Sequence, residues 1–410
     1  MPAEEEQSFR ITAMRFITAH SSSPDWPQAL DAIAGQVAAA RARAGTVTRP
    51  NLGLVYLQPG LAPPGPRLLQ DLRARLGVAH WVGAEVAHVF AGADQGIVDA
   101  SVGVMLLQLA QRDFRVFSGL QPLPAVSRGW RGAHTALVHG DSGEDELDEL
   151  LAELGARTAS GDAWGGVLAP CGSLQLADAA LRGGVSGLAL SSRVSLLGGL
   201  SQGLQAVGPA RTVTRCADNV VYALDGQPAL GALLDDLGQA RSEREDEQWR
   251  ALVPSLREVV VGLSWPQQTP PGSPQSAVLR GLIGIDPRAQ GVALAAEPQP
   301  GMRLRFCRRE QQESLRDLLR LCTEVREDIE QRRQVVAQAG HRHATQPMRG
   351  AVFISCAGRS EAAHRAERQL VRSQLGDVPL LGFRAAGEVS GGALHAYSSV
   401  LRVFASDPSM

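Results

Sequence analysis

The chain has 410 residues, 44% of them hydrophobic and 20% charged, and its 40 basic residues are balanced by 42 acidic ones. This length exceeds one ordinary core, so two or three domains are expected. The net charge of −2 gives no broad attraction to nucleic acid or anionic lipid. Every basic residue is arginine, which excludes enzymes that form a Schiff base through lysine and nucleotide-binding proteins that need a Walker A lysine.

The first quarter of the chain predicts helices and buried strands in alternation. Apolar residues at helical spacing predict a helix over residues 25–43, and a second one over 66–76. The apolar run over 52–57 ends at a Pro-Gly pair and predicts a buried strand, and another strand is expected over 101–109. The N-terminus is acidic and has no apolar h-region, so no signal peptide is expected.

The middle of the chain changes to short β runs separated by glycine, which suggests an antiparallel sheet. The candidate strands are 167–169, 185–190, 195–204, 212–216 and 220–224. A linker is expected over 264–276, which contains four prolines. Strands near Leu282 and Met302 follow, and then a long helix over 313–336 with one apolar stripe.

An internal repeat relates the two ends of the chain. The strand 52–57, a helix and the stretch 76–86 form one copy, and the strand 351–356, a helix and the stretch 375–389 form the other. Each copy ends in a Glu-Val pair, so Glu85 in the first copy is predicted to be equivalent to Glu388 in the second. This duplication predicts an α/β or α+β fold with two related lobes, mostly antiparallel sheets covered by helices, and a ligand cleft between the lobes.

Three ordered motifs support a family resemblance. SQG, GP, VT and LDGQPA occur in order over 201–229, and GIDP follows at 284–287. Near the C-terminus come Cys356-Ala-Gly-Arg-Ser360, then VPLLGFRAAGE over 378–388, then LHAYS over 394–398. Over most of residues 35–405 the chain resembles the FIST family. It departs from the family pattern where Ser360 replaces a second glycine and Ser398 replaces a threonine.

The resemblance implies a domain order and a class of function. It predicts an N-terminal strand and helix start over 1–34, a FIST N-type domain over 35–232 and a FIST C-type domain over 233–410. FIST proteins are viewed as intracellular sensory domains for small ligands such as amino acids. The chain leaves no room for a kinase or cyclase domain, so a separate signalling partner is expected. We expect a cytoplasmic module with no nucleic-acid partner, no membrane partner and no cofactor.

The ligand site is predicted mainly from the C-terminal motif. Arg359 can hold a carboxylate through two parallel hydrogen bonds, and Glu388 can receive an ammonium group, so that together they suit an amino acid. The alternative is a buried Arg359–Glu388 pair that only holds the lobe closed. Glu85 either completes the site or caps a turn. The full predicted set is Cys356, Gly358, Arg359, Gly382, Gly387, Glu388, His395, Glu85, Gln202 and Arg211.

Three other functions remain open from the sequence. Cys356 is either a reactive thiol of a hydrolase or transferase, or a buried small side chain, and the enzyme would need a histidine such as His364 or His395. A haem-based nitric oxide sensor is the second alternative, since a subset of the family resembles such sensors. Its axial ligand would come from His80, His88, His341, His343 or His395. The third is a protein-interaction scaffold. Five cysteines without CxxC spacing argue against a zinc site.

Overall fold

The computed structural model describes residues 16–44, 49–61, 63–93, 96–124, 132–239, 249, 252, 256, 259–264, 278–338 and 348–406. Apart from its first residue, the predicted linker 264–276 lies outside these residues. The chain is α+β and forms two compact units. Unit 1 comprises Met1–Ser201, Asp317–Ala393 and Tyr397–Met410, and unit 2 comprises Gln202–Arg316 and Leu394–Ala396.

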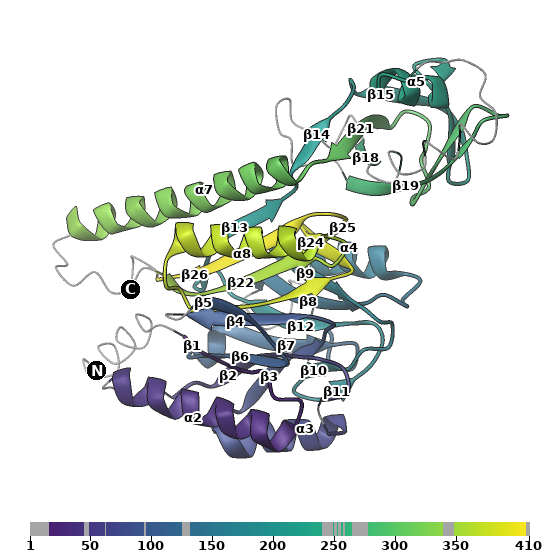
Figure 1. Ribbon diagram of the computed structural model, residues 1–410. Coiled ribbons are helices and arrows are strands. Elements are labelled where there is room, and N and C mark those ends of the chain that lie inside the picture. The colour runs from purple at the N-terminus through teal and green to yellow at the C-terminus, as the bar shows by residue number, and fades with distance from the viewer. Residues whose placement is uncertain are drawn as a thin grey trace. The chain divides into compact units, whose positions relative to one another are not determined.

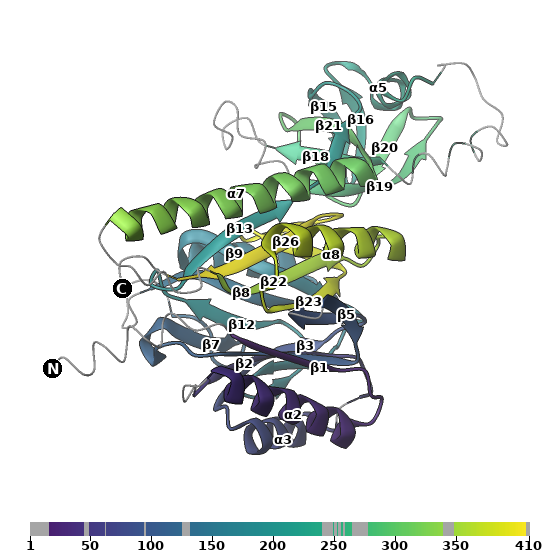
Figure 2. The same cartoon turned by 60° about the vertical axis from the view of Figure 1, so that its left-hand side comes forward.

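Three six-stranded sheets share one strand order, and they belong to unit 1 except for Leu394 and His395 at the edge of sheet 2 (Figures 1 and 2). Sheet 1 runs β1 (Ile17–Ser21), β6 (Val102–Leu107), β2 (Leu52–Leu57), β3 (His80–Glu85), β10 (Gln175–Ala177) and β11 (Ala180–Leu181). Sheet 2 runs β7 (Phe114–Ser118), β12 (Val185–Leu190), β8 (Ala133–Asp141), β9 (Thr158–Leu168), β24 (Gly387–Ser390) and β25 (Ala393–His395). Sheet 3 runs β13 (Ser195–Ser201), β26 (Ser399–Ala405), β22 (Met348–Cys356), β23 (Leu380–Ala385), β4 (Val89–Ala93) and β5 (Gly96–Ala100).

Each sheet is built on one repeat of the chain, so the duplication predicted from the sequence is a triplication. In every repeat two parallel strands are joined by a helix: α3 (Gly65–Leu76), α4 (Leu147–Ala156) or α8 (Glu361–Leu375). The hairpin that follows leaves its own sheet. Thus β4–β5 of repeat 1 joins sheet 3, β10–β11 of repeat 2 joins sheet 1, and β24–β25 of repeat 3 joins sheet 2. The three hairpins are therefore exchanged in a closed cycle.

Three glycines fix which residues of the repeats are equivalent. Each lies in the second parallel strand, where a Cβ atom would come within 1.7 to 2.1 Å of a carbonyl oxygen of the first: Gly83 against Val55, Gly165 against Val138, and Gly382 against Phe353. Counting from them, Glu85 corresponds to Arg384, and Glu388 corresponds to Gln175 and Val89. The predicted equivalence of Glu85 and Glu388 is thus wrong, because the second Glu-Val pair lies in the exchanged hairpin.

The inner faces of the three sheets form one packed core. Tyr56 and His139, at equivalent positions of repeats 1 and 2, are joined by a 2.9 Å hydrogen bond, and Phe383 packs on Tyr56. Helices α2 (Trp26–Ala44) and α3 cover the outer face of sheet 1, while α7 (Gln311–Gln338) and α8 cover that of sheet 3 (Figure 1). Because side chains fill the space between the two copies recognised in the sequence, a binding site has to be sought at the ends of the strands.

Unit 2 contains a closed antiparallel barrel, in the order β21 (Arg303–Arg309), β15 (Arg211–Ala217), β16 (Val220–Leu224), β20 (Gly291–Leu294), β19 (Val278–Asp286) and β18 (Val259–Ser264). The barrel closes because β21 pairs with both β15 and β18. Helix α5 (Ala229–Asp236) contributes Leu230 and Leu233 to its core. The short elements β14 (Leu204–Ala206) and β17 (Gln227–Pro228) pair with β21 and β16.

The predicted α+β fold class and most predicted elements are confirmed, but the strands predicted in the middle of the chain do not form one sheet. The helices expected over 25–43, 66–76 and 313–336 correspond to α2, α3 and α7. The strands expected between 167 and 224 all exist, yet they enter sheet 2, sheet 3 and the barrel of unit 2 instead of one antiparallel sheet. Strand composition predicts local conformation well, but pairing depends on contacts distant in sequence.

Candidate functional site

The C-terminal motif forms the turn between β22 and α8. Ser360 is the N-cap of α8, and its Oγ accepts a 3.2 Å hydrogen bond from the Ala363 amide, which gives a physical reason for serine at this position. Gly358 lies against the Tyr397 ring, 3.3 Å from where a Cβ atom would be. We call the group formed here the Cys356 site; its members are Cys356, Gly358, Arg359, Glu388, Tyr397 and Ser398.

Glu388 is the fully buried carboxylate of this site. Its Oε2 accepts hydrogen bonds from the Ser398 amide (3.0 Å) and the Ser398 hydroxyl (2.8 Å). Its Oε1 accepts no hydrogen bond of good geometry from any residue that the structure describes, and the group near the carboxylate is the Cys356 thiol, a weak donor. Burial raises the pKa of Glu388 to about 7, so the carboxyl group changes charge near neutral pH.

The equivalent position of repeat 2 shows what the fold itself requires there. Gln175 is also fully buried, and its Oε1 accepts a 2.6 Å hydrogen bond from Ser186. Its Nε2 donates to the carbonyl groups of Gly183 and Gly184, which precede the last strand of the repeat as Ser398 does in repeat 3. A neutral amide therefore fulfils the structural role of this position, and the carboxylate of Glu388 is not needed for it.

Cys356 is buried beside Glu388, with 3% of its surface exposed. The backbone amides of Gly358 and Tyr397 face its sulfur and, with Arg359, favour a thiolate. Burial and the Glu388 carboxylate outweigh them and raise the pKa of the thiol to about 11. Cys356 is therefore a protonated thiol at neutral pH.

Arg359 is held by an internal carboxylate. Its guanidinium pairs with Glu367 of α8 and donates a 2.8 Å hydrogen bond to the Tyr397 carbonyl. The ion pair of Arg359 is thus with Glu367, where the sequence had suggested Glu388; the charge of Arg359 also lowers the pKa of the Glu388 carboxyl group. Only 11% of the Arg359 side chain and 2% of the Glu367 side chain are exposed, so this is a buried pair.

Ser355 and His364 extend this network without forming a catalytic triad. The Ser355 hydroxyl donates to Glu367 Oε2 (2.7 Å) and so accepts from His364 Nδ1 (3.1 Å). In a nucleophilic triad the serine would donate to the imidazole, so the direction is the opposite one. Burial lowers the pKa of His364 to about 4. Ser355 and Glu367 were not predicted as site residues; the signals for them were a serine at the end of an apolar strand and a His–Glu pair three residues apart on a helix.

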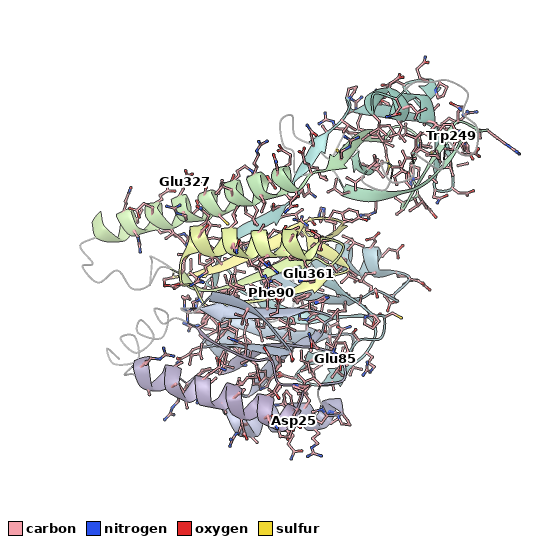
Figure 3. All side chains as sticks on the ribbon, in the orientation of Figure 1. Asp25, Glu85, Phe90, Trp249, Glu327 and Glu361 are labelled. Carbon is pink, nitrogen blue, oxygen red and sulfur yellow. The ribbon has the colours of Figure 1, made fainter. Side chains whose placement is uncertain are left out.

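The structure brings together four of the ten predicted site residues: Cys356, Gly358, Arg359 and Glu388. Gly387 begins the strand that carries Glu388, and Gly382 lies on β23 at a close strand approach. The other four have partners of their own. Glu85, at the end of β3 in sheet 1, accepts a hydrogen bond from the Leu174 amide. Figure 3 labels Glu85 and, apart from it, Glu361 at the start of α8, next to the turn that carries the Cys356 site. In unit 2, Gln202 bonds to His395 (3.0 Å), and Arg211 forms a two-pronged pair with Asp236.

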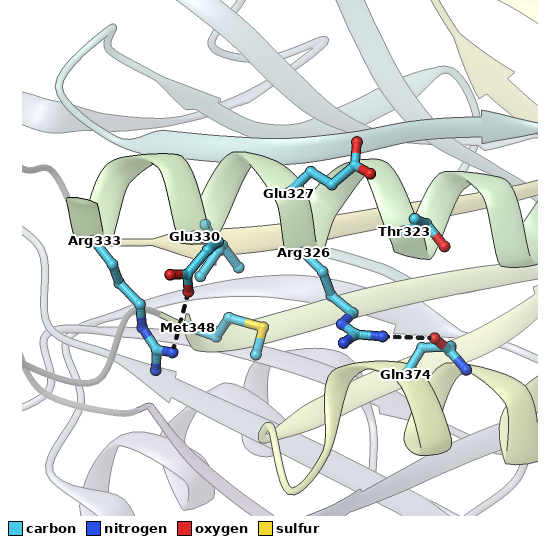
Figure 4. A pocket seen from close by; sticks show the side chains of 8 residues that line it. Thr323, Arg326, Glu327, Glu330, Arg333, Met348 and Gln374 are labelled. Carbon is cyan, nitrogen blue, oxygen red and sulfur yellow. Dashed lines mark hydrogen bonds and ion pairs between the residues drawn. The ribbon is translucent and has the colours of Figure 1, made fainter. Parts of the chain in front are cut away.

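Two open pockets lie on the outer faces of unit 1. One, of about 410 Å³, lies between α7 and α8, where Arg326 bonds to Gln374 and Arg333 faces Glu330 above Met348 (Figure 4). The other, of about 630 Å³, is lined by the first turn of α2, by the loop before α3 and by α3. No histidine lines either pocket, so the residues of these pockets do not fit a haem group.

Two of the histidines considered as haem ligands, His80 and His395, have side-chain partners of other kinds. His80 Nδ1 lies 2.7 Å from Asp178 and its Nε2 3.4 Å from Gln111. His341 and His343 lie outside the described residues. Within the described residues, no group of three or more His, Cys, Asp or Glu side chains is arranged to hold a metal ion.

No helix in the described part of the chain is both long enough and apolar enough to cross a membrane. This agrees with α7, which has 28 residues and carries charged side chains along its length.

Comparison with known proteins places the chain in a family. The model of the FIST N domain matches residues 51–227, and that of the FIST C domain matches residues 229–390. The boundary between them falls inside unit 2 and therefore differs from the boundary between the compact units. The "Uncharacterized protein Rv0628c" of Mycobacterium tuberculosis is 26% identical over 213 residues, which are 50% of each chain. The "Uncharacterized protein Mb0898c" of Mycobacterium bovis is 28% identical over 217 residues, 51% of this chain and 50% of its own.

The chain spans about half the length of the curated relatives it matches. Both family models match, and together they cover most of the chain. The chain therefore belongs to the FIST family, whose domains are associated with sensing and signal transduction.

Proposed function

We propose that the chain is a cytoplasmic sensory module that binds a small ligand at the Cys356 site, without chemistry of its own, and signals through a separate protein. The observation that carries the proposal is the buried Glu388 carboxylate. One of its oxygens accepts no good hydrogen bond, although the equivalent Gln175 is satisfied on both of its polar atoms. A buried carboxylate oxygen whose neighbouring donor is a thiol, a weak donor, is destabilising, and this supports a stronger donor on a ligand.

The chemistry of the site favours a ligand with an ammonium or amine group. An ionised carboxylate is acceptor-only, and a charged donor gives the strongest hydrogen bond that Glu388 Oε1 can receive. A cationic ligand also supplies the charge that keeps Glu388 ionised in a buried position. The ligand class proposed is therefore an amino acid or a related amine, recognised through its nitrogen.

Thermal unfolding in the presence of matched compounds tests this proposal. Amino acids, the corresponding amines and the corresponding keto acids differ in whether they carry the ammonium group. Amino acids or amines are expected to raise the melting temperature, because a ligand at about 100 times its Kd adds about 2.7 kcal/mol of stability. Keto acids should give no shift. Stabilisation by keto acids alone, or by no compound of the three sets, would count against the proposal.

A cysteine enzyme is the alternative that the geometry supports less. The two histidines considered as its base bond to other residues: His364 Nδ1 to Ser355, and His395 Nδ1 to Gln202. With a pKa of about 11 the thiolate of Cys356 is scarce at neutral pH.

Alkylation of the folded protein with iodoacetamide at pH 7, followed by peptide mass spectrometry, checks the state of this thiol. Cys171 is exposed and serves as the internal reference. Cys356 is expected to react at least about a hundredfold more slowly than Cys171, because only the thiolate attacks and burial limits access. Equal or faster labelling of Cys356 would restore the enzyme hypothesis.

A further inference from the structure

The Cys356 site is closed to solvent in the structure, although its chemistry suits a ligand. Glu388 has no exposed surface, and 3% of the Cys356 surface is exposed. A ligand can therefore reach the Glu388 carboxylate only if a neighbouring group moves. All six members of the site belong to unit 1, so that group can be sought within this unit.

Most members of the site are held by their own bonds. Cys356 and Glu388 lie on strands β22 and β24. Ser398 is buried and bonds to Glu388 through both its amide and its hydroxyl. Arg359 is fixed by its buried ion pair with Glu367. The glycine and the tyrosine of the site remain, and of these two the tyrosine has a side chain that can turn.

The Tyr397 ring lies beside Gly358, where the site approaches the surface. A Cβ atom built on Gly358 would stand 3.3 Å from Tyr397 Cε1 and 3.7 Å from Cys356 Sγ. One methyl group would thus touch both the ring and the thiol. Because Gly358 is exposed and Tyr397 is half-buried, the ring covers the thiol on the side of the site that faces solvent.

Tyr397 also has an unusual backbone conformation. Its φ of 61° lies in the left-handed region, which residues with a large side chain seldom adopt. Residues held in such conformations cluster at ligand sites, where the surrounding structure imposes them. Here the amide faces Cys356 and the carbonyl accepts a hydrogen bond from Arg359. The backbone is therefore held from both sides, while rotation of the ring about χ1 requires no change of φ.

We propose that the Tyr397 side chain is the movable cover of the Cys356 site, and that a ligand reaches Glu388 after this ring turns away from Gly358. The inference rests on the proposed function of the site. With the ring turned outwards, its face borders the path to the Glu388 carboxylate. An aromatic face attracts a cation, so the cover and the carboxylate favour the same class of ligand, an amine in its ammonium form.

The alkylation rate of Cys356 with iodoacetamide measures the opening of this cover without any ligand. Tyr397→Gly removes the ring and keeps the backbone, because glycine adopts a positive φ without steric cost. We expect the Cys356 rate to rise at least about tenfold, which is equivalent to about 1.4 kcal/mol. Tyr397→Phe is the matched control. The atoms nearest to Gly358 are ring carbons, so this variant should keep the wild-type rate.

Cys322, buried in the core of unit 1 beneath α7, reports global unfolding in the same sample and should keep its rate. An unchanged Cys356 rate in Tyr397→Gly would overturn the proposal, as would an equal rise in Tyr397→Phe. If the glycine variant unfolds, Tyr397→Asn decides the question, because asparagine also tolerates the left-handed region. A rise that Cys322 matches in both of these variants would show that Tyr397 is needed for the fold and would likewise overturn the proposal.

Thermal unfolding with amines separates this inference from the proposed function. A selective rise of Cys356 labelling in Tyr397→Gly, with no stabilisation of the wild type by any amine, would refute the proposed ligand class and support Tyr397 as the cover. Stabilisation by an amine, with unchanged labelling in Tyr397→Gly, would support the ligand class and refute the cover.

Discussion

Replacing Glu388 with glutamine is expected to make the protein progressively more stable than the wild type as the pH rises from 4.5 to 8. Between its ordinary pKa of 4.5 and the folded value of about 7, the wild-type folded state keeps a proton that the unfolded chain has released. The unfolded state then binds fewer protons, so this group lowers stability with rising pH. The shift corresponds to about 3 kcal/mol at 1.36 kcal/mol per pKa unit. A glutamine amide does not titrate, so the variant does not lose stability in this way as the pH rises. Gln175 shows that an amide is accommodated at the equivalent position of repeat 2.

Urea unfolding of both proteins at several pH values measures this difference. His139 and His364, whose pKa values burial lowers to about 3 and about 4, titrate in both proteins and cancel in the comparison. A difference that stays constant with pH, or a glutamine variant that loses stability at pH 8, would show that the carboxylate is structural.

Substituting alanine for Gly83 or Gly382 is expected to have the largest effect on stability, a loss of more than about 3 kcal/mol for each. The added Cβ atom would stand 1.7 Å from the Val55 carbonyl oxygen in one case and 2.1 Å from that of Phe353 in the other. These are backbone atoms of a central strand, which cannot turn away as a flexible side chain can. The parallel pair of that repeat would have to separate, and the sheet depends on it.

Gly35→Ala is the control for these variants. Gly35 lies on the exposed side of α2 with no atom within 4 Å of a built Cβ, so alanine there should stabilise the helix by up to about 1 kcal/mol. Chemical denaturation of the three variants gives the free energies of unfolding directly. Wild-type stability in Gly83→Ala would contradict the strand approach on which the equivalence of the repeats is based.

The local elements and two of the three copies of the repeat were predicted from the sequence. There are physical reasons why the remaining copy, repeat 2, was not recognised. In repeats 1 and 3 a Leu-Gly pair ends the helix, with Gly77 and Gly376 as the C-caps, whereas in repeat 2 the pair Leu154-Gly155 lies inside the last turn of α4, which ends at Arg157. The spacing of the pair in this copy therefore does not match that of the other two. Hairpin exchange leaves no local trace either, because a strand has the same composition whichever sheet it joins. For this reason Glu85 and Glu388 matched in sequence but not in space.

The candidate site was predicted in part for a similar reason. Cys356, Gly358 and Arg359 are adjacent in sequence, and Glu388 follows the next strand, so their proximity follows from one βαβ unit. The ion pair of Arg359 with Glu367 could not be predicted in this way. Glu367 faces Arg359 from one side of α8, and charged residues on a helix are more often solvated than buried. The unsatisfied oxygen of Glu388 is a property of three-dimensional packing and has no signature in the sequence.

Isothermal titration calorimetry with the amino acid or amine that gives the largest thermal shift measures whether the Glu388 carboxylate recognises the ligand. The wild type, Glu388→Gln and Glu85→Gln are compared, since Glu85 has its own partner in sheet 1. Glu85→Gln is expected to bind the compound as tightly as the wild type does. Glu388→Gln should lose at least about tenfold in affinity, the effect of one hydrogen bond to a charged group. Wild-type affinity in Glu388→Gln would contradict the claim that this carboxylate recognises the ligand.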